Sequence, residues 1–155
     1  GEIRFHDPDD RLVAYCSAGF LGSPRPDDLR YDNTPVDLIR FGDGSGPAFT
    51  ERFDRFLGIR VTAPGVAEAP RRDDLIQGSS TFQGGVVCAV AETAAESVLD
   101  APIVGLETRY LSSIRLGSAR ATATRLDTGL ARVEVIDTDR SDRVASVVIA
   151  RSVTR

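Results

Sequence analysis

The sequence of 155 residues has no lysine, methionine or tryptophan, and its single histidine is His6. A Ser-His-Asp triad needs a histidine as its base, and the long region that follows His6 offers none. Zinc sites in proteins draw on clustered histidines and cysteines, which are equally scarce. We therefore expect neither a catalytic triad nor a metal centre, and we expect His6 to be a turn residue.

Cysteine occurs only at Cys16 and Cys88. Cys88 stands in an apolar segment, so we expect a buried free thiol and no structural disulfide. No apolar run is long enough for a membrane span and no signal-peptide pattern is found, which predicts a cytoplasmic protein without a membrane partner. Because the sequence starts at Gly1 without a methionine, we expect the natural start of translation to lie upstream.

The composition is typical of a globular protein, with 41% hydrophobic and 27% charged residues. The net charge is −4, whereas nucleic-acid binding requires a basic patch. We therefore expect no nucleic-acid partner.

What the sequence does contain is a pair of glycines that opens a mostly apolar segment, 84–99, with Glu92 in its third turn. Apolar residues nearly all round predict a helix that is buried on most sides. The first N–H groups of a helix lack partners and lie at its positive end, so they suit an anion or oxyanion. A carboxylate among alanines and valines costs free energy unless it is paired or used. Together these features indicate an oxyanion donor and a base for attack on a carbonyl.

This segment resembles the helix of the PaaI-like hot dog thioesterases, which begins His-Gly-Gly and carries an acid nine residues after the histidine. Gln83 stands at the histidine position and Glu92 at the acid position. The resemblance covers roughly residues 53–155. It implies an α+β hot dog fold, an antiparallel sheet wrapped around the central helix (about 84–99). It also places the entry to the first strand at 56–61 and further strands at 108–117, 119–126, 131–137 and 143–152. Alternating polar and apolar residues at 121–124 and 132–136 support two of these strands.

The resemblance also implies an acyl-CoA thioesterase that needs no cofactor, since the coenzyme A thioester is its substrate. Glu92 would be the general base or the nucleophile, with a pKa raised by burial and by the nearby Glu96. The amides of Gly84 and Gly85 would hold the thioester oxygen. Gln83 would take part at the catalytic centre, although it forms hydrogen bonds and cannot titrate.

Two further residues are candidate substrate contacts. Gln77 is a loose match to an asparagine of the family, and Thr93 would hold a water or a substrate group. A helical threonine also commonly bonds to its own backbone, which is the simpler alternative for Thr93. Glu92 has structural alternatives too, namely exposure to solvent or an ion pair with Arg109 or Arg115.

Two classes of function remain. One is the thioesterase, which the two glycines and the acid favour. The other is a non-catalytic acyl-CoA-binding domain or a degenerate structural hot dog domain, favoured by the loss of the histidine at Gln83. The basic residues are all arginines, which suit phosphate contacts with coenzyme A but are by default solvated surface. In the family the helix start and the acid come from different units, which implies a homodimer or a tandem pairing, with a higher oligomer as a further alternative.

The chain is expected to have three parts. Residues 1–20 form a strand hairpin whose sequence resembles 134–145, so it is either the end of a preceding hot dog domain or an unrelated hairpin. Residues 21–47 read as linker and loop. Residues 48–155 form the hot dog domain. Within it we expect 48–57 to be a short amphipathic helix over the core, and 64–74 to be a poorly formed strand or an exposed loop.

Overall fold

The computed structural model describes residues 2–6, 9–17, 51–77 and 80–153. The chain divides into two compact units, Gly1–Gly46 and Pro47–Arg155. In the first unit, β1 (Glu2–His6) and β2 (Leu12–Ser17) pair as an antiparallel hairpin. The Nδ1 atom of His6 lies 2.7 Å from a carboxylate oxygen of Asp10, across the turn of that hairpin. The predicted linker at 21–47 lies outside the described residues, and the tandem arrangement stays a prediction.

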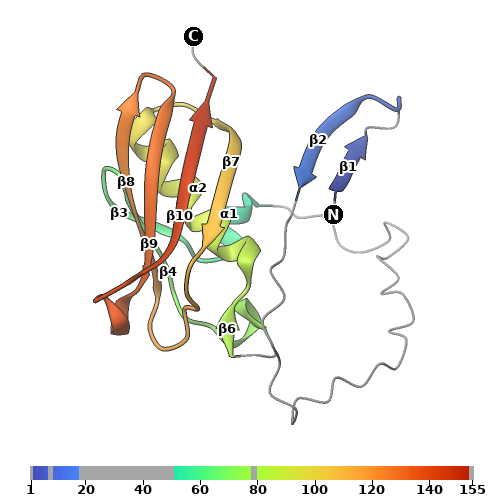
Figure 1. The fold of residues 1–155 in the computed structure, drawn as a ribbon. Helices are drawn as coiled ribbons and strands as arrows, with labels where there is room; N and C mark the ends of the chain where they lie inside the picture. Colours follow the sequence, from blue (N-terminus) through green and yellow to red (C-terminus); the bar gives the residue numbers. More distant parts are fainter. Residues whose placement is uncertain (1, 7–8, 18–50, 78–79, 154–155) are drawn as a thin grey trace, which may run out of the picture. The chain divides into compact units, whose positions relative to one another are not determined.

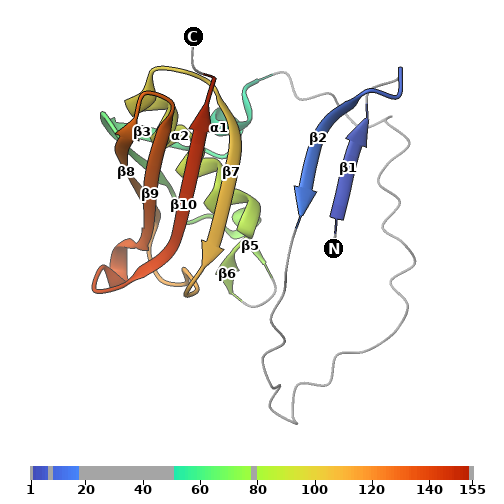
Figure 2. The same cartoon turned by 45° about the horizontal axis from the view of Figure 1, so that its top comes forward.

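The second unit is built on a six-stranded antiparallel sheet in the order β3-β4-β8-β9-β10-β7. The long helix α2 (Gly84–Leu99) lies along one face of this sheet (Figures 1 and 2). This confirms the predicted α+β architecture and the predicted bounds of the helix. The strands are β3 (Arg60–Ala63), β4 (Val66–Ala69), β7 (Ile103–Tyr110), β8 (Ala119–Asp127), β9 (Leu130–Asp137) and β10 (Val144–Ser152).

The core between helix and sheet is made of small side chains. Val90, Ala91 and Ala94 of α2 are fully buried, as are the sheet residues that α2 packs against, Ala67, Ala69, Ala121, Ala131, Val133, Val148 and Ala150. Alanine at so many core positions lets the helix approach the sheet closely. Among the described residues, none of the helices is long and apolar enough to span a membrane.

The segment before the sheet differs from the prediction of a helix over the core at 48–57. The helix α1 is only Phe53–Phe56, and these two aromatic rings are 53% and 42% exposed and stack on each other. Only Leu57 enters the core. The helix ends there because Gly58, at a φ of 73°, turns the chain toward β3. Residues 48–50 lie outside the described ranges.

The prediction for 64–74 is wrong in its first half. Residues Val66–Ala69 form β4, a regular strand between β3 and β8 with Ala67 and Ala69 fully buried. Gly65 makes the preceding turn at a φ of 77°. Residues 70–74 are mostly exposed and lead through a short 3₁₀ turn, η1 (Asp73–Leu75), to the two-residue strands β5 (Ile76–Gln77) and β6 (Thr81–Phe82). The predicted strand at 108–117 starts earlier and ends at Tyr110.

The loop between β7 and β8 is held by one buried carboxylate. Asp137, at the end of β9, accepts hydrogen bonds from the backbone N–H groups of Arg115, Leu116 and Gly117 at 2.7–2.9 Å, and from that of Asp139 at 3.1 Å. Burial alone would raise the pKa of Asp137, but these four donors outweigh it and lower the pKa below its ordinary value. Asp137 is therefore a structural anion at the centre of the loop.

This loop in turn holds the segment that leads into α2. The carbonyl of Ile114 accepts a hydrogen bond from the N–H of Phe82, and the carbonyl of Leu75 accepts one from Gln83, both at 3.0 Å. Phe82 is buried in the core. The backbone just before Gly84 is therefore fixed from two sides.

Replacing Asp137 by asparagine should lower the free energy of unfolding by about 2–4 kcal/mol, because charge-assisted hydrogen bonds to a buried group are lost. Urea unfolding at pH 7 measures this, with the exposed Asp142→Asn as the matched control. Because the folded-state pKa is lowered, this stabilisation is present above the unfolded pKa of about 3.9. It is lost as the pH falls through the folded-state pKa, so the difference between variant and wild type should shrink in acid. Equal midpoints at pH 7 would contradict the role given to Asp137.

Candidate functional site

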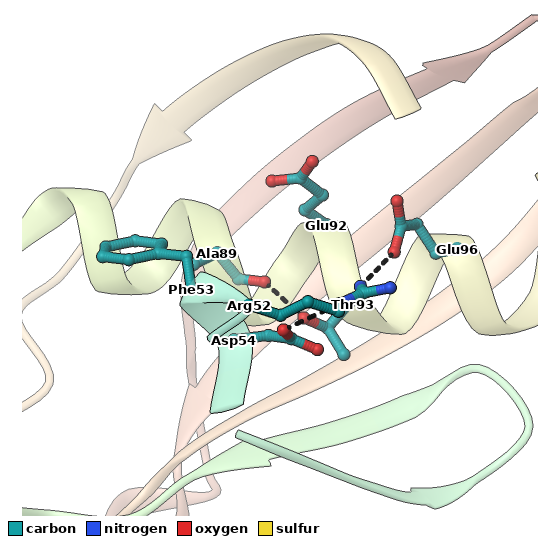
Figure 3. A pocket seen from close by; sticks show the side chains of 7 residues that line it. All are labelled: Arg52, Phe53, Asp54, Ala89, Glu92, Thr93 and Glu96. Carbon is teal, nitrogen blue, oxygen red and sulfur yellow. Dashed lines mark hydrogen bonds and ion pairs between the residues drawn. The ribbon is translucent and has the colours of Figure 1, made fainter. Parts of the chain in front are cut away.

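A small pocket of about 160 Å³ opens where α1 meets the exposed side of α2. It is lined by Arg52, Phe53, Asp54, Ala89, Glu92, Thr93 and Glu96. Figure 3 shows Glu92 and Glu96 on the same helix, one turn apart, and Arg52 reaching toward Glu96. The predicted acid therefore lies in a hollow of the surface and not in the core.

Glu92 is half-buried, and its carboxylate makes no hydrogen bond or ion pair with any residue that the structure describes. Burial raises the pKa of Glu92 above its ordinary value, and the negative charge of Glu96 raises it further, while the Arg52 guanidinium lowers it. The candidate ion pairs with Arg109 and Arg115 are not found in the described part of the chain. Arg109 instead contacts Glu107 at 3.4 Å. A carboxylate kept without a partner and with a raised pKa is suited to accept a proton.

Arg52 is a site residue that sequence reasoning missed. Its guanidinium lies 3.1 Å from Asp54 and 3.5 Å from Glu96, so it bridges α1 and α2. This bridge places a positive charge beside the pocket and limits the repulsion between Glu92 and Glu96. No sequence signal points to it, because Arg52 and Glu96 are 44 residues apart.

The start of α2 is as open as the sequence predicts. Gln83 is the N-cap residue, its side chain is exposed, and it makes no capping hydrogen bond. Its carbonyl accepts from the N–H groups of Val86 and Val87 at 3.0 and 3.3 Å. Within the described ranges, no acceptor is found for the N–H groups of Gly84 and Gly85. Two adjacent amides at the positive end of a 16-residue helix are thus available to an anionic oxygen.

The two glycines have different surroundings. A Cβ atom on Gly84 would lie 2.9 Å from the hydroxyl of Tyr110, whereas a Cβ on Gly85 would meet nothing within 4 Å. The Tyr110 hydroxyl donates a hydrogen bond to the carbonyl of Gly84 at 2.9 Å. Gly84 is therefore needed for packing inside the chain, while the space beside Gly85 is open to a ligand.

The two predicted substrate contacts lie in different places. Gln77 is exposed in β5, and its amide nitrogen donates to the Thr81 hydroxyl at 2.7 Å across the short hairpin before α2. Thr93 lines the pocket, but its hydroxyl donates to the carbonyl of Ala89 at 2.9 Å, which is the simpler alternative for a helical threonine. Their contact with a substrate stays a prediction.

Within one chain the amides and the acid are too far apart to act together. Gly85 and Glu92 are seven residues apart on α2, which at 1.5 Å per residue separates them by about 10 Å along the helix axis. A single carbonyl group cannot contact both. The geometry therefore supplies two half-sites on each chain, one at the start of α2 and one at its third turn.

The contrast between the two glycines gives a stability prediction. Gly84→Ala should lower the free energy of unfolding by about 1 kcal/mol, since the new methyl displaces the bonded Tyr110. Gly85→Ala should leave it unchanged or raise it by up to about 1 kcal/mol, because alanine is the better helix former. Thermal unfolding of both variants measures the difference, and it should shrink in a Tyr110→Phe background. A larger loss for Gly85→Ala would show that the space beside it is filled.

No family model and no curated protein matches the sequence. Solved structures do match its fold. A thioesterase from Haemophilus influenzae is 20% identical and aligns over 65% of this chain and 80% of that chain, with a TM-score of 0.54. A mutant of the phenylacetic acid degradation protein PaaI from Thermus thermophilus is 25% identical, over 64% of this chain and 96% of that chain, with a TM-score of 0.52.

A third similar structure is a Bacillus halodurans protein solved with CoA, which is 15% identical over 63% of this chain and 71% of that chain, with a TM-score of 0.56. In each comparison the aligned part of this chain is similar in length to its second unit. The chain therefore has the hot dog fold of the PaaI-like and thioesterase-superfamily proteins.

Proposed function

We propose that this chain hydrolyses acyl-CoA thioesters, with Glu92 as the catalytic carboxylate and the amides of Gly84 and Gly85 as the oxyanion hole. The observation that carries the proposal is the half-buried Glu92 carboxylate, which has a raised pKa and no partner among the described residues. It stands on the same helix that begins with two glycine amides, for which the described ranges offer no acceptor. The similar structures support it, since one is a thioesterase and another was solved with CoA.

The chemistry follows from these two groups. A water molecule attacks the thioester carbon, Glu92 takes its proton, and the carbonyl electrons move onto an oxygen held by the glycine N–H groups. When the carbonyl re-forms, the carbon–sulfur bond breaks and the proton passes to the coenzyme A thiolate, which leaves a carboxylic acid. Direct attack by the Glu92 carboxylate, followed by hydrolysis of the anhydride, uses the same oxyanion hole. Gln83, exposed beside the amides, offers a neutral hydrogen bond in place of a histidine.

Because the two half-sites of one chain lie about 10 Å apart, we place the complete site between two hot dog units. The sheet offers a surface for a second copy at its edge strand β7. Three apolar residues along β7 or directly after it are at least half exposed, namely Val104, Tyr110 and Leu111. An edge strand of eight residues with this much exposed apolar area is suited to pair with another strand.

The charges of β7 indicate how two copies would pair. Antiparallel pairing of β7 with itself, with Thr108 on the two-fold axis, sets Glu107 opposite the partner's Arg109 and Leu106 opposite the partner's Tyr110. Opposite charges therefore meet at two symmetric places, as favourable cross-strand pairing requires. A shift by one or more residues in this register loses both charge pairs.

The same axis brings the two half-sites together. On α2 the midpoint between Gly85 and Glu92 falls between Cys88 and Ala89, and the Cys88 sulfur lies 3.4 Å from the Thr108 hydroxyl. A two-fold axis at Thr108 therefore passes near the midpoint of two antiparallel α2 helices. The glycine amides of one copy then face the partner's Glu92. The same geometry is available to a tandem chain that carries two units.

Replacing Glu92 by glutamine should lower kcat by at least about 100-fold while leaving the binding of acyl-CoA intact, because the amide cannot accept the proton. Hydrolysis of acetyl-, benzoyl- and palmitoyl-CoA and calorimetric binding to the variant measure both. Glu51→Gln, an exposed change outside the pocket, is the control. In the wild type, the acid limb of the pH profile should lie above the ordinary carboxyl range. Binding without turnover by the wild type would instead favour the non-catalytic function.

Single charge reversals at Glu107 or Arg109 should weaken the dimer by about tenfold or more, because like charges then face each other across the two-fold axis. The double variant Glu107→Arg/Arg109→Glu should restore it. Sedimentation velocity over a concentration series measures the assembly. Arg132→Glu on the interior strand β9, where Arg132 pairs with Glu134 at 2.7 Å, is the matched control. A dimer that is indifferent to all three β7 variants would place the interface elsewhere.

A further inference from the structure

A chain of hydrogen bonds leads from β7 to the first peptide of α2. The Thr108 hydroxyl lies 3.4 Å from the Cys88 sulfur, the Cys88 sulfur lies 3.2 Å from the Tyr110 hydroxyl, and this hydroxyl lies 2.9 Å from the carbonyl of Gly84. The chain therefore links three side chains from two elements to a single backbone group at the site.

The direction of all three hydrogen bonds follows from the last acceptor, the carbonyl of Gly84. The carbonyl of Gly84 can only accept, so the single hydrogen of the Tyr110 hydroxyl is donated to it. The contact between Cys88 and Tyr110 must then use the S–H hydrogen of Cys88, which leaves Thr108 to donate to the sulfur. All three donors consequently point toward Gly84.

The carbonyl of Gly84 belongs to the same peptide group as the N–H of Gly85. A hydrogen bond accepted by a peptide carbonyl draws electron density away from its nitrogen, which makes the N–H a stronger donor. Resting on the proposed function of Gly85, we propose that Tyr110 is a positioning residue that orients and polarises this peptide, so that the Gly85 N–H binds the thioester oxyanion more strongly.

The surroundings of Tyr110 agree with a role beyond packing. Tyr110 is 56% exposed within its own chain, so its ring adds little to the core, whereas its hydroxyl reaches the helix start. Gly84 provides the room, since a Cβ there would lie 2.9 Å from that hydroxyl. Gly85 is exposed, and no acceptor for its N–H is found among the described residues. The oxygen of this peptide is therefore hydrogen-bonded, while its N–H has no acceptor within the part of the chain that the structure describes.

The first test is independent of activity. In the intact wild-type protein and in Tyr110→Phe, the ¹⁵N resonance of Gly85 is measured, because it responds to hydrogen bonding at the preceding carbonyl. We expect an upfield shift of Gly85 in the variant, with Gly58 in the distant turn before β3 unchanged. An unchanged Gly85 resonance, with the hydroxyl removed and the fold retained, would overturn the proposal.

The second test is kinetic. One oxyanion donor is worth about 10²–10³ in kcat, and a neighbouring hydrogen bond strengthens it by about 10–30%, so Tyr110→Phe should lower kcat roughly two- to eightfold. KM should stay constant, and the thermal midpoint should fall only slightly, since ring packing is kept and a single partly exposed hydrogen bond is lost. Cys88→Ser, which keeps a donor to Tyr110, should be nearly neutral, whereas Cys88→Ala should lower kcat by a smaller factor than Tyr110→Phe.

The outcomes separate the two proposals. Turnover by the wild type that is lost in Glu92→Gln but unchanged in Tyr110→Phe would overturn the role of Tyr110 alone. A loss in Tyr110→Phe that appears in KM or in the thermal midpoint, and not in kcat, would mean a structural role and would also overturn it. No turnover by the wild type on any of the three acyl-CoAs would overturn the proposed function and the positioning role of Tyr110 with it.

Discussion

The close approach of α2 to the sheet is the contact on which the rest of the structure depends. Small side chains on both surfaces allow it, since Ala91 and Ala94 share one core with buried alanines of β4, β8, β9 and β10. One side of the helix thereby lies against the sheet, while the other, which carries Cys88, Ala89 and Glu92, is only partly covered. A larger residue in this layer would lift the helix and break the contact between Tyr110 and Gly84. The packing of the core therefore also determines the geometry of the site.

Much of the fold could be predicted from the sequence because its strongest signals are local. The apolar segment at 84–99 predicts a helix, and the alternation in β8, β9 and β10 predicts strands. Each of these patterns lies within one continuous stretch of chain. The strand β4 could not be predicted, because its four residues lie between Pro64 and Pro70 and are typical of an interrupted segment. Its regular structure comes from pairing with β3 and β8, and such pairing has no local signature.

The candidate site also contains features that the sequence predicts and features that only the structure reveals. The pair of glycines and Glu92 are recognised from their spacing within one helix, and α2 contains all three, while their roles stay predictions. The contacts of Arg52, Tyr110 and Asp137 could not be predicted, since their partners lie 44, 26 and about 20 residues away. Each of these residues is unremarkable in the sequence and acquires its role only when strands and helix come together. The roles of Gln77 and Thr93 stay predictions, because the structure bonds both side chains to their own neighbours.

The two edges of the sheet are unequal, and this has a consequence for the fate of the newly folded chain. At one edge, β3 is only four residues long and is followed by Pro64, so it offers little to a further strand. At the other, β7 is twice as long and exposes apolar side chains. If a second copy covers β7, the joined sheet ends in two short strands and growth stops at a closed pair. Without a second copy, β7 is an exposed edge strand that can pair with strands of other molecules. Covering β7 would therefore also protect the chain against aggregation.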